Sequence, residues 1–83
     1  MTRKEIKVKV IEKIQESTIT TDEKINEKQI IDDLGYDSLE SLELVLRLES
    51  EFNIGIPDED LKNFQEKTIG ELINYLDNVI NHQ

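Results

Sequence analysis

Ser38 is the residue whose type and position best suit it to carry a covalently attached group. It follows Asp37, a good helix N-cap, and Glu40 stands three positions after that cap, which completes a capping box. We therefore expect Ser38 in the first turn of a helix, where free backbone N–H groups and the helix dipole favour an added phosphate by roughly 0.3–1 kcal/mol. A serine at such a loop–helix junction is within reach of a modifying enzyme. The alternative is a first-turn serine with no further role.

A calcium loop of the EF-hand type fits this region poorly. Taking Asp32 as position one puts Leu34 and Tyr36 at positions three and five, where the loop needs oxygen ligands. Asp37 falls at position six, where a glycine is needed, and only Glu43 at position twelve fits. His82 is the one histidine and there is no cysteine, so we expect no metal site, no disulfide and no cysteine nucleophile.

The length of the chain favours a carrier or adaptor over an enzyme. With 83 residues it is expected to form a single domain over 1–83, with a modest core and little room for a deep catalytic cleft. We expect no catalytic residues. No run of residues approaches the roughly 20 apolar positions that a bilayer requires. The first residues lack the apolar segment of a secretory signal, so the cytoplasm is the expected location.

The acidic charge is concentrated in the middle of the chain. Nineteen acidic and ten basic residues give a net charge of −9, and within 32–60 only Arg47 opposes the acidic residues. An anionic protein repels nucleic-acid phosphates and anionic lipid, so we expect neither nucleic acid nor a membrane as a partner. Basic patches on other proteins suit it better. The alternative is that the acidic cluster is a solvated face with no partner.

Helical periodicity predicts an all-α fold, a small four-helix bundle with a long first connection and a short third helix. We expect helices over about 3–16, 38–53 and 69–81, and a short one that Asp58 caps and that runs through about Leu61–Phe64. Capping boxes at Thr2 with Glu5 and at Thr68 with Glu71 support the predicted starts of the first and last helices. The connection 17–36 is expected to pack on the core and to contain a helical turn near 27–32.

The second helix is rich in leucine. At 100° per residue a wide apolar arc is predicted, opposite an arc of charged residues. The apolar arc contains Leu39, Leu42, Val45, Leu46 and Phe52, and the charged arc contains Glu40, Glu43, Arg47 and Glu51. Leu44 and Leu48 widen the apolar region beyond one core-facing stripe, so this helix is expected to leave apolar surface for a partner or ligand.

The residues around Ser38 resemble the LGxDSL attachment motif of acyl carrier proteins. The match runs through 33–39 and continues through 43–45, 48–49, 51–52 and 56–59, ending with Thr68-Ile69-Gly70-Glu71-Leu72. The residue-by-residue resemblance covers about 32–76, whereas the first helix resembles the family only in its general character and not in specific residues. DSL alone is a weak signal, but this ordered set in an acidic chain of 83 residues is strong.

This resemblance implies a covalent cofactor, 4′-phosphopantetheine, on Ser38. It implies that a phosphopantetheinyl transferase, also called holo-acyl-carrier-protein synthase, moves the group from coenzyme A to the motif serine, with Asp37 beside it. Acyl groups would then be held as thioesters on the terminal thiol of the arm. The carrier would supply no catalytic group and would act as a monomer that delivers its cargo to fatty-acid or polyketide synthase enzymes.

The resemblance also implies docking residues and an interior acyl site. Glu43 is the first candidate for contacts with basic patches, together with Glu40, Leu42, Leu46, Glu49, Asp58 and Glu59. A solvated surface for the glutamates, and a core position for the two leucines, are the alternatives. The acyl chain would lie among Leu46, Phe52, Ile56, Leu61, Phe64 and Ile73, unless these residues form an ordinary packed core.

Several positions depart from common fatty-acid carriers and leave the pathway open. They are Leu46 where methionine is common, Arg47 within the acidic face, Gly55 for an acidic residue and Phe64 for a smaller aliphatic one. We expect fatty-acid biosynthesis, and the alternative is a specialised carrier for a polyketide, aminoacyl or D-alanyl pathway. A pure adaptor without the arm is a further alternative, which the intact Ser38 motif disfavours.

Overall fold

The computed structural model describes residues 1–17, 25–34 and 38–82, and the side chains of Ser17 and Ser38 are not part of that description. Over these ranges the chain forms three α-helices, α1 (Arg3–Ser17), α2 (Ser38–Phe52) and α3 (Ile69–Asn81). Three short 3₁₀ helices join them, η1 (Ile31–Leu34), η2 (Asp58–Leu61) and η3 (Phe64–Glu66). The predicted all-α class is confirmed for this part of the chain.

Capping boxes set the starts of α1 and α3 where the sequence predicts them. The Thr2 backbone N–H donates to Glu5 Oε1 at 3.1 Å, and the Glu5 N–H donates to Thr2 Oγ1 at 3.2 Å. Thr68 and Glu71 form the same pair of bonds, both at 3.1 Å. In each box, the hydrogen bond that the Glu side chain accepts from the threonine N–H lowers the pKa of that carboxyl.

The four-helix bundle is not confirmed, because the predicted third helix is two 3₁₀ turns. Asn63 has a positive φ of 60°, the left-handed conformation, and it separates η2 from η3. A left-handed residue cannot continue a right-handed helix, so the turn that starts at Asp58 does not reach Phe64. Asp58 is also not the cap: Pro57 holds that position, without a side-chain hydrogen bond. The predicted turn near 27–32 lies slightly later, as η1.

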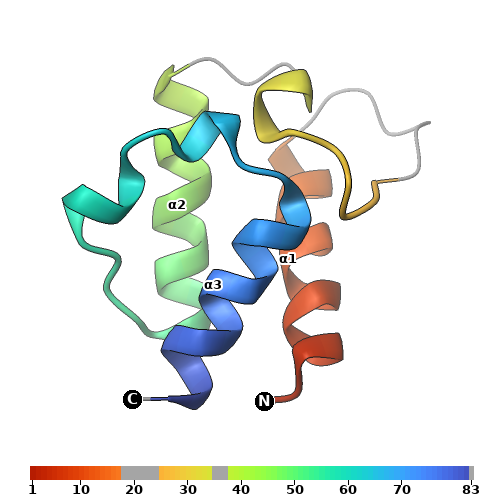
Figure 1. The fold of residues 1–83 in the computed structure, drawn as a ribbon, viewed down its shortest axis with the longest axis vertical. Coiled ribbons are helices and arrows are strands. Elements are labelled where there is room, and N and C mark those ends of the chain that lie inside the picture. The colour runs from red at the N-terminus through yellow and green to blue at the C-terminus, as the bar shows by residue number, and fades with distance from the viewer. Residues whose placement is uncertain (18–24, 35–37, 83) are drawn as a thin grey trace.

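The core lies where α1 packs against both α2 and α3 (Figure 1). α1 and α2 each contribute three large apolar side chains with no more than 2% exposure, and α3 contributes four: Ile6, Val10, Ile14, Leu44, Val45, Leu48, Ile69, Leu72, Ile73 and Leu76. The 3₁₀ helix η3 packs on α2 and inserts Phe64 into the same cluster. Each such side chain contributes about 1.5–3 kcal/mol to the stability of the fold when it is removed from water. The core therefore fixes how the helices are rotated about their axes.

The described part of the first connection is anchored to the start of α3. The Ile31 N–H donates to the Lys67 carbonyl at 2.9 Å, and the Ile69 N–H donates to the Gln29 carbonyl at 2.9 Å. The Gly70 N–H donates to the Glu27 carbonyl at 2.8 Å. Ile31 is fully buried, which confirms that this segment packs back on the core as predicted.

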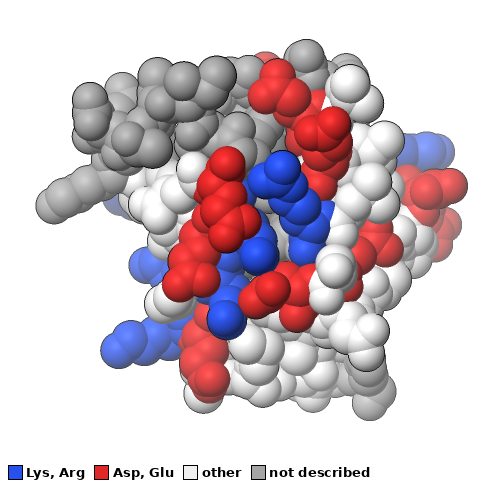
Figure 2. Space-filling model, turned by 180° about the vertical axis from the view of Figure 1, so that it is seen from behind, with Lys and Arg blue, Asp and Glu red and all other residues white. Residues whose placement is uncertain are grey.

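Ion pairs tie the basic first helix to the acidic remainder of the chain. Arg3 and Lys7 both pair with Glu27, and Lys9 and Lys13 both pair with Glu51 of α2. Figure 2 shows acidic and basic side chains lying against one another on the back of the molecule. The hydrogen bonds from Arg3, and then from Lys7, lower the pKa of Glu27 from 4.5 to about 2.

We predict that the stabilising effect of Glu27 is lost in acid. Its pKa is lower in the folded state, so the ionised carboxylate stabilises the fold above about pH 4.5, and this contribution disappears as the pH falls towards 2. Urea unfolding of the wild type and of Glu27→Gln should give a constant difference in unfolding free energy above pH 5. The difference should then shrink towards pH 2. Glu12→Gln, on an exposed position of α1, is the control. A difference independent of pH would contradict the prediction.

Candidate functional site

Ser38 is the first residue of α2, as the sequence predicts. Asp37 lies outside the described residues, so its capping role stays a prediction. A residue at this position belongs to the helical turn whose backbone N–H groups have no partner within the helix. The first turn of α2 is therefore a suitable place for a group linked through a phosphate.

The predicted apolar arc of α2 is wrong about which leucines face the core. Leu44 and Leu48 are fully buried, whereas Leu39, Leu42 and Leu46 have 65%, 47% and 56% of their surface exposed. Leucines stand on most sides of this helix, so hydrophobic periodicity alone does not select a face. The contacts with α1 make the selection, since they bury Leu44 and Leu48 and pair Glu51 with Lys9 and Lys13.

The exposed leucines share one side of α2 with an acidic residue. Glu43 stands four positions after Leu39 and three before Leu46, so these side chains are neighbours on the helix surface. All are exposed, and we call Leu39, Leu42, Glu43 and Leu46 the outer face of α2. This face begins one residue after Ser38. It combines a negative charge with apolar surface, the two features that a basic protein partner would contact.

The other acidic candidates are placed differently. Asp58 and Glu59 are exposed on η2, and Glu40 is exposed in the first turn of α2. Glu49 is half-buried, and its Oε2 accepts a hydrogen bond from the Ile56 N–H at 3.2 Å. Glu49 therefore helps to hold the loop after α2, and its docking role stays a prediction.

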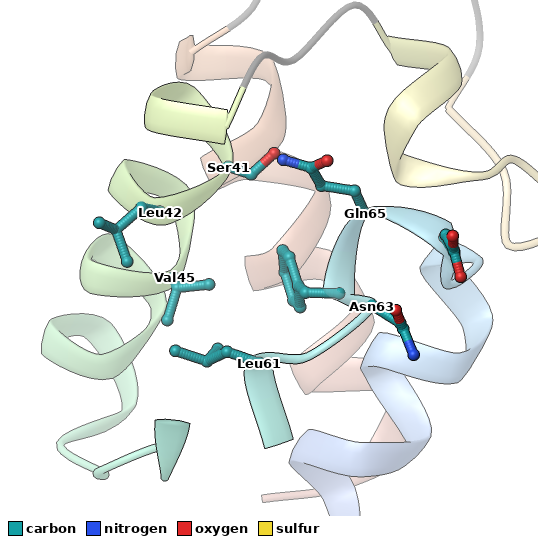
Figure 3. Close-up of a pocket in the computed structure, with 8 residues that line it drawn as sticks. Ser41, Leu42, Val45, Leu61, Asn63 and Gln65 are labelled. Atoms are coloured by element: carbon teal, nitrogen blue, oxygen red, sulfur yellow. The ribbon is translucent and has the colours of Figure 1, made fainter. Parts of the chain in front are cut away.

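A pocket of about 380 Å³ opens between α2 and the η2–η3 segment (Figure 3). Its apolar walls are Leu42, Val45, Leu61 and Phe64, and its polar lining is Ser41, Asn63, Gln65 and Glu66. Of the residues predicted for an interior acyl site, Leu61 and Phe64 line this pocket. The prediction is wrong for Leu46, because this side chain is exposed. Ile56 and Ile73 lie in the packed core.

Sequence reasoning missed Ser41. This residue is 4% exposed, and no described residue provides a hydrogen-bond partner for its buried hydroxyl. The sequence feature that points to Ser41 is its spacing from Ser38, which is about one helical turn. The spacing does not reveal burial, which depends on how η3 packs against α2.

One hydrogen bond links the segment beside the pocket to α3. The Tyr75 hydroxyl donates to Asp60 Oδ2 at 2.7 Å, which joins α3 to η2. Burial first, and this hydrogen bond second, raise the pKa of Tyr75 to about 12. The Tyr75 hydroxyl therefore keeps the proton that it donates throughout the neutral range.

None of the described helices is long and apolar enough to cross a bilayer.

Comparison with known proteins agrees with the motif around Ser38. Residues 8–76 match the protein family described as "Phosphopantetheine attachment site". Three similar proteins are each named "Acyl carrier protein" and come from Clostridium perfringens strains SM101, ATCC 13124 and 13. Each is 44% identical to this chain over 59 residues, which cover 71% of this chain and 75% of the relative.

We predict that neighbouring leucines of α2 differ sharply in their contribution to stability. Leu44→Ala should lower the free energy of unfolding by about 2–5 kcal/mol, because it leaves a cavity in the core. Leu42→Ala, the matched control on the exposed side, should change it by less than about 0.5 kcal/mol. Urea unfolding measures both. A larger loss of unfolding free energy for Leu42→Ala than for Leu44→Ala would mean that α2 turns Leu42, and not Leu44, towards the core.

Proposed function

The chain belongs to the acyl carrier protein family, and from this premise we propose that Ser38 is the residue that bears its phosphopantetheine arm. The observation that carries the proposal is the place of Ser38 as the first residue of α2, within the segment that matches the phosphopantetheine attachment family. The phosphodiester would lie at the start of α2, where the helix dipole favours negative charge.

The surroundings of Ser38 fit such an arm and its cargo. When bound, the group supplies a thiol that holds acyl chains as thioesters. A pocket with apolar walls opens one helical turn further along α2, and the buried hydroxyl of Ser41 lines it. The chain's own part is to position, shelter and present the acyl group. We propose that it supplies no catalytic group and that partner enzymes carry out the reactions.

We propose that the outer face of α2 docks those enzymes. Its exposed leucines offer apolar contact area, and Glu43 offers a charge that basic patches attract. Asp58 and Glu59 on η2, and Glu40 in the first turn of α2, extend the negative field. Such charge pairs raise the rate at which the two proteins associate, and their attraction weakens as salt is added. A weak, rapidly formed complex suits a carrier that must leave one enzyme for the next.

The partners that we propose are a phosphopantetheinyl transferase and the enzymes of fatty-acid biosynthesis. The identity of 44% with proteins named "Acyl carrier protein" supports this assignment. We further propose that the protein works in the cytoplasm as a monomer.

Modification at Ser38 is the first test. Incubation with coenzyme A and a phosphopantetheinyl transferase should raise the intact mass by that of one phosphopantetheine group. Ser38→Ala should abolish the increase, because the accepting oxygen is gone. Ser50→Ala, at an exposed position of the same helix, should show the same mass increase as the wild type. An unmodified wild-type protein, or a modified Ser38→Ala variant, would overturn the proposal.

Reversal of the charge at Glu43 tests the docking face. Glu43→Lys should slow the transferase several-fold at low salt, because it puts a positive charge opposite a basic patch. The effect should shrink as added salt screens the charges. Glu12→Lys makes the same change of charge at an exposed position of α1, and it should have a much smaller effect. Equal rates for Glu43→Lys and wild type at every salt concentration would rule out Glu43 as a docking residue.

A further inference from the structure

One ridge along the surface of α2 carries charges of opposite sign at successive turns. Residues at intervals of four positions make up this ridge: Leu39, Glu43, Arg47 and Glu51. Each lies about one turn beyond the one before it, so their side chains are neighbours on the helix surface. The first three are exposed. Counting from Ser38, the ridge therefore presents an apolar side chain, then a negative charge, then a positive charge.

Within the described residues, the fold neutralises only the last charge of this ridge. Glu51 pairs with Lys9 of α1 at 3.3 Å and with Lys13 of α1 at 3.5 Å. No described carboxylate forms a salt bridge with Arg47, although Glu43 and Glu51 stand one turn to either side of it. Glu43 has no salt bridge with a described basic residue either. Both charges are therefore available to another molecule.

A positive charge at this place works against simple attraction to a basic patch. Arg47 is the only basic residue within 32–60, a segment that is otherwise strongly acidic. It lies about 6 Å beyond Glu43 along the helix axis, so a basic side chain that approaches Glu43 is also repelled by Arg47. The repulsion is replaced by attraction if the partner places a carboxylate opposite Arg47.

An enzyme that reaches Ser38 across the outer face of α2 also covers Arg47. Nine residues separate the two, which is about 13.5 Å along the helix. A standard interface covers about 800 Å² on each protein, a patch roughly 28 Å across. A covered arginine without a partner loses hydration, which opposes binding. Such an enzyme therefore needs an acidic group opposite Arg47 as well as a basic group opposite Glu43.

Building on the proposed docking role of α2, we propose that Arg47 is a specificity-determining residue of this surface. It selects a phosphopantetheinyl transferase whose docking patch holds a basic side chain opposite Glu43 and an acidic side chain opposite Arg47. This partner recognises the order of the two charges and not only the net negative charge of the carrier. An enzyme with a uniformly basic patch is disfavoured by Arg47.

The direction of the change on neutralising Arg47 tests this proposal. The protein without its arm would be incubated with coenzyme A and the phosphopantetheinyl transferase of its source organism, and kcat/KM would be measured at low and high salt. Arg47→Gln should lower kcat/KM roughly 2- to 5-fold at low salt, the range for loss of one exposed ion pair. The loss should shrink as salt is added.

Lys4→Gln is the matched control for Arg47→Gln. It removes one positive charge at an exposed position of α1, and it should not lower kcat/KM. If the transferase responded only to net negative charge, Arg47→Gln would raise kcat/KM. An increase, or no change, would overturn the proposal. Glutamine and arginine have similar helix propensities and the position is exposed, so Arg47→Gln should fold.

A charge swap separates the order of the charges from the net charge. Glu43→Arg combined with Arg47→Glu keeps the net charge at −9 and reverses the order along the ridge. Both contacts with the transferase then become repulsive, so the swapped protein should be modified more slowly than Glu43→Gln or Arg47→Gln alone. Modification of the swapped protein at the wild-type rate would contradict the proposal.

Binding without modification provides a second readout. In a Ser38→Ala background no arm can be attached, and isothermal titration calorimetry would give the Kd for the transferase with coenzyme A bound. Addition of Arg47→Gln should raise this Kd roughly 2- to 5-fold, whereas addition of Lys4→Gln should leave it unchanged. A Kd that Arg47→Gln does not alter would overturn the proposal. A wild-type protein that binds in this Arg47-dependent way and yet is never modified would instead contradict the proposed function, so the two failures are distinguishable.

Discussion

The structure depends on the rotation of α2 about its own axis. This helix places Leu44 and Leu48 in the core, where neither has any exposed surface. Burial against α1 and the ion pairs of Glu51 with Lys9 and Lys13 hold it in this orientation. A different rotation would bury the outer face of α2 and expose the core leucines. The positions of the outer face and of the pocket both follow from this one constraint.

The same rotation separates three roles on a single helix. The start of α2 at Ser38 accepts the arm in our proposal, and the outer face is left for partner enzymes. Ser41 and Val45, together with Leu42 at the edge of the outer face, border the pocket with η2 and η3. The Tyr75–Asp60 hydrogen bond and the left-handed Asn63 shape the opposite wall. A cargo tethered at Ser38 would thus lie beside the surface that we propose for docking.

Local sequence chemistry predicted the helix ends well and the helix faces poorly. The threonine–glutamate boxes at Thr2 and Thr68 need only four consecutive residues, so the starts of α1 and α3 follow from the sequence alone. The face of α2 does not, because leucines stand on most of its sides and only contacts with α1 select among them. The burial of Ser41 depends on tertiary packing, which no local pattern encodes, whereas the break falls at Asn63, a residue type that adopts the left-handed conformation more readily than most. The place of Ser38 was predictable from its motif, whereas the pocket beside it was not.

The most direct measurement of the central claim is to locate the arm on protein purified from its native source. Cleavage after Lys28 and Arg47 by trypsin gives a peptide, Gln29–Arg47, whose only two serines are Ser38 and Ser41. Fragmentation between Leu39 and Glu40 in the mass spectrometer distinguishes these two serines. The account predicts one phosphopantetheine group on the fragment that ends at Leu39 and contains Ser38. A group on the Ser41 fragment, or a native protein with no such group on this peptide, would contradict it.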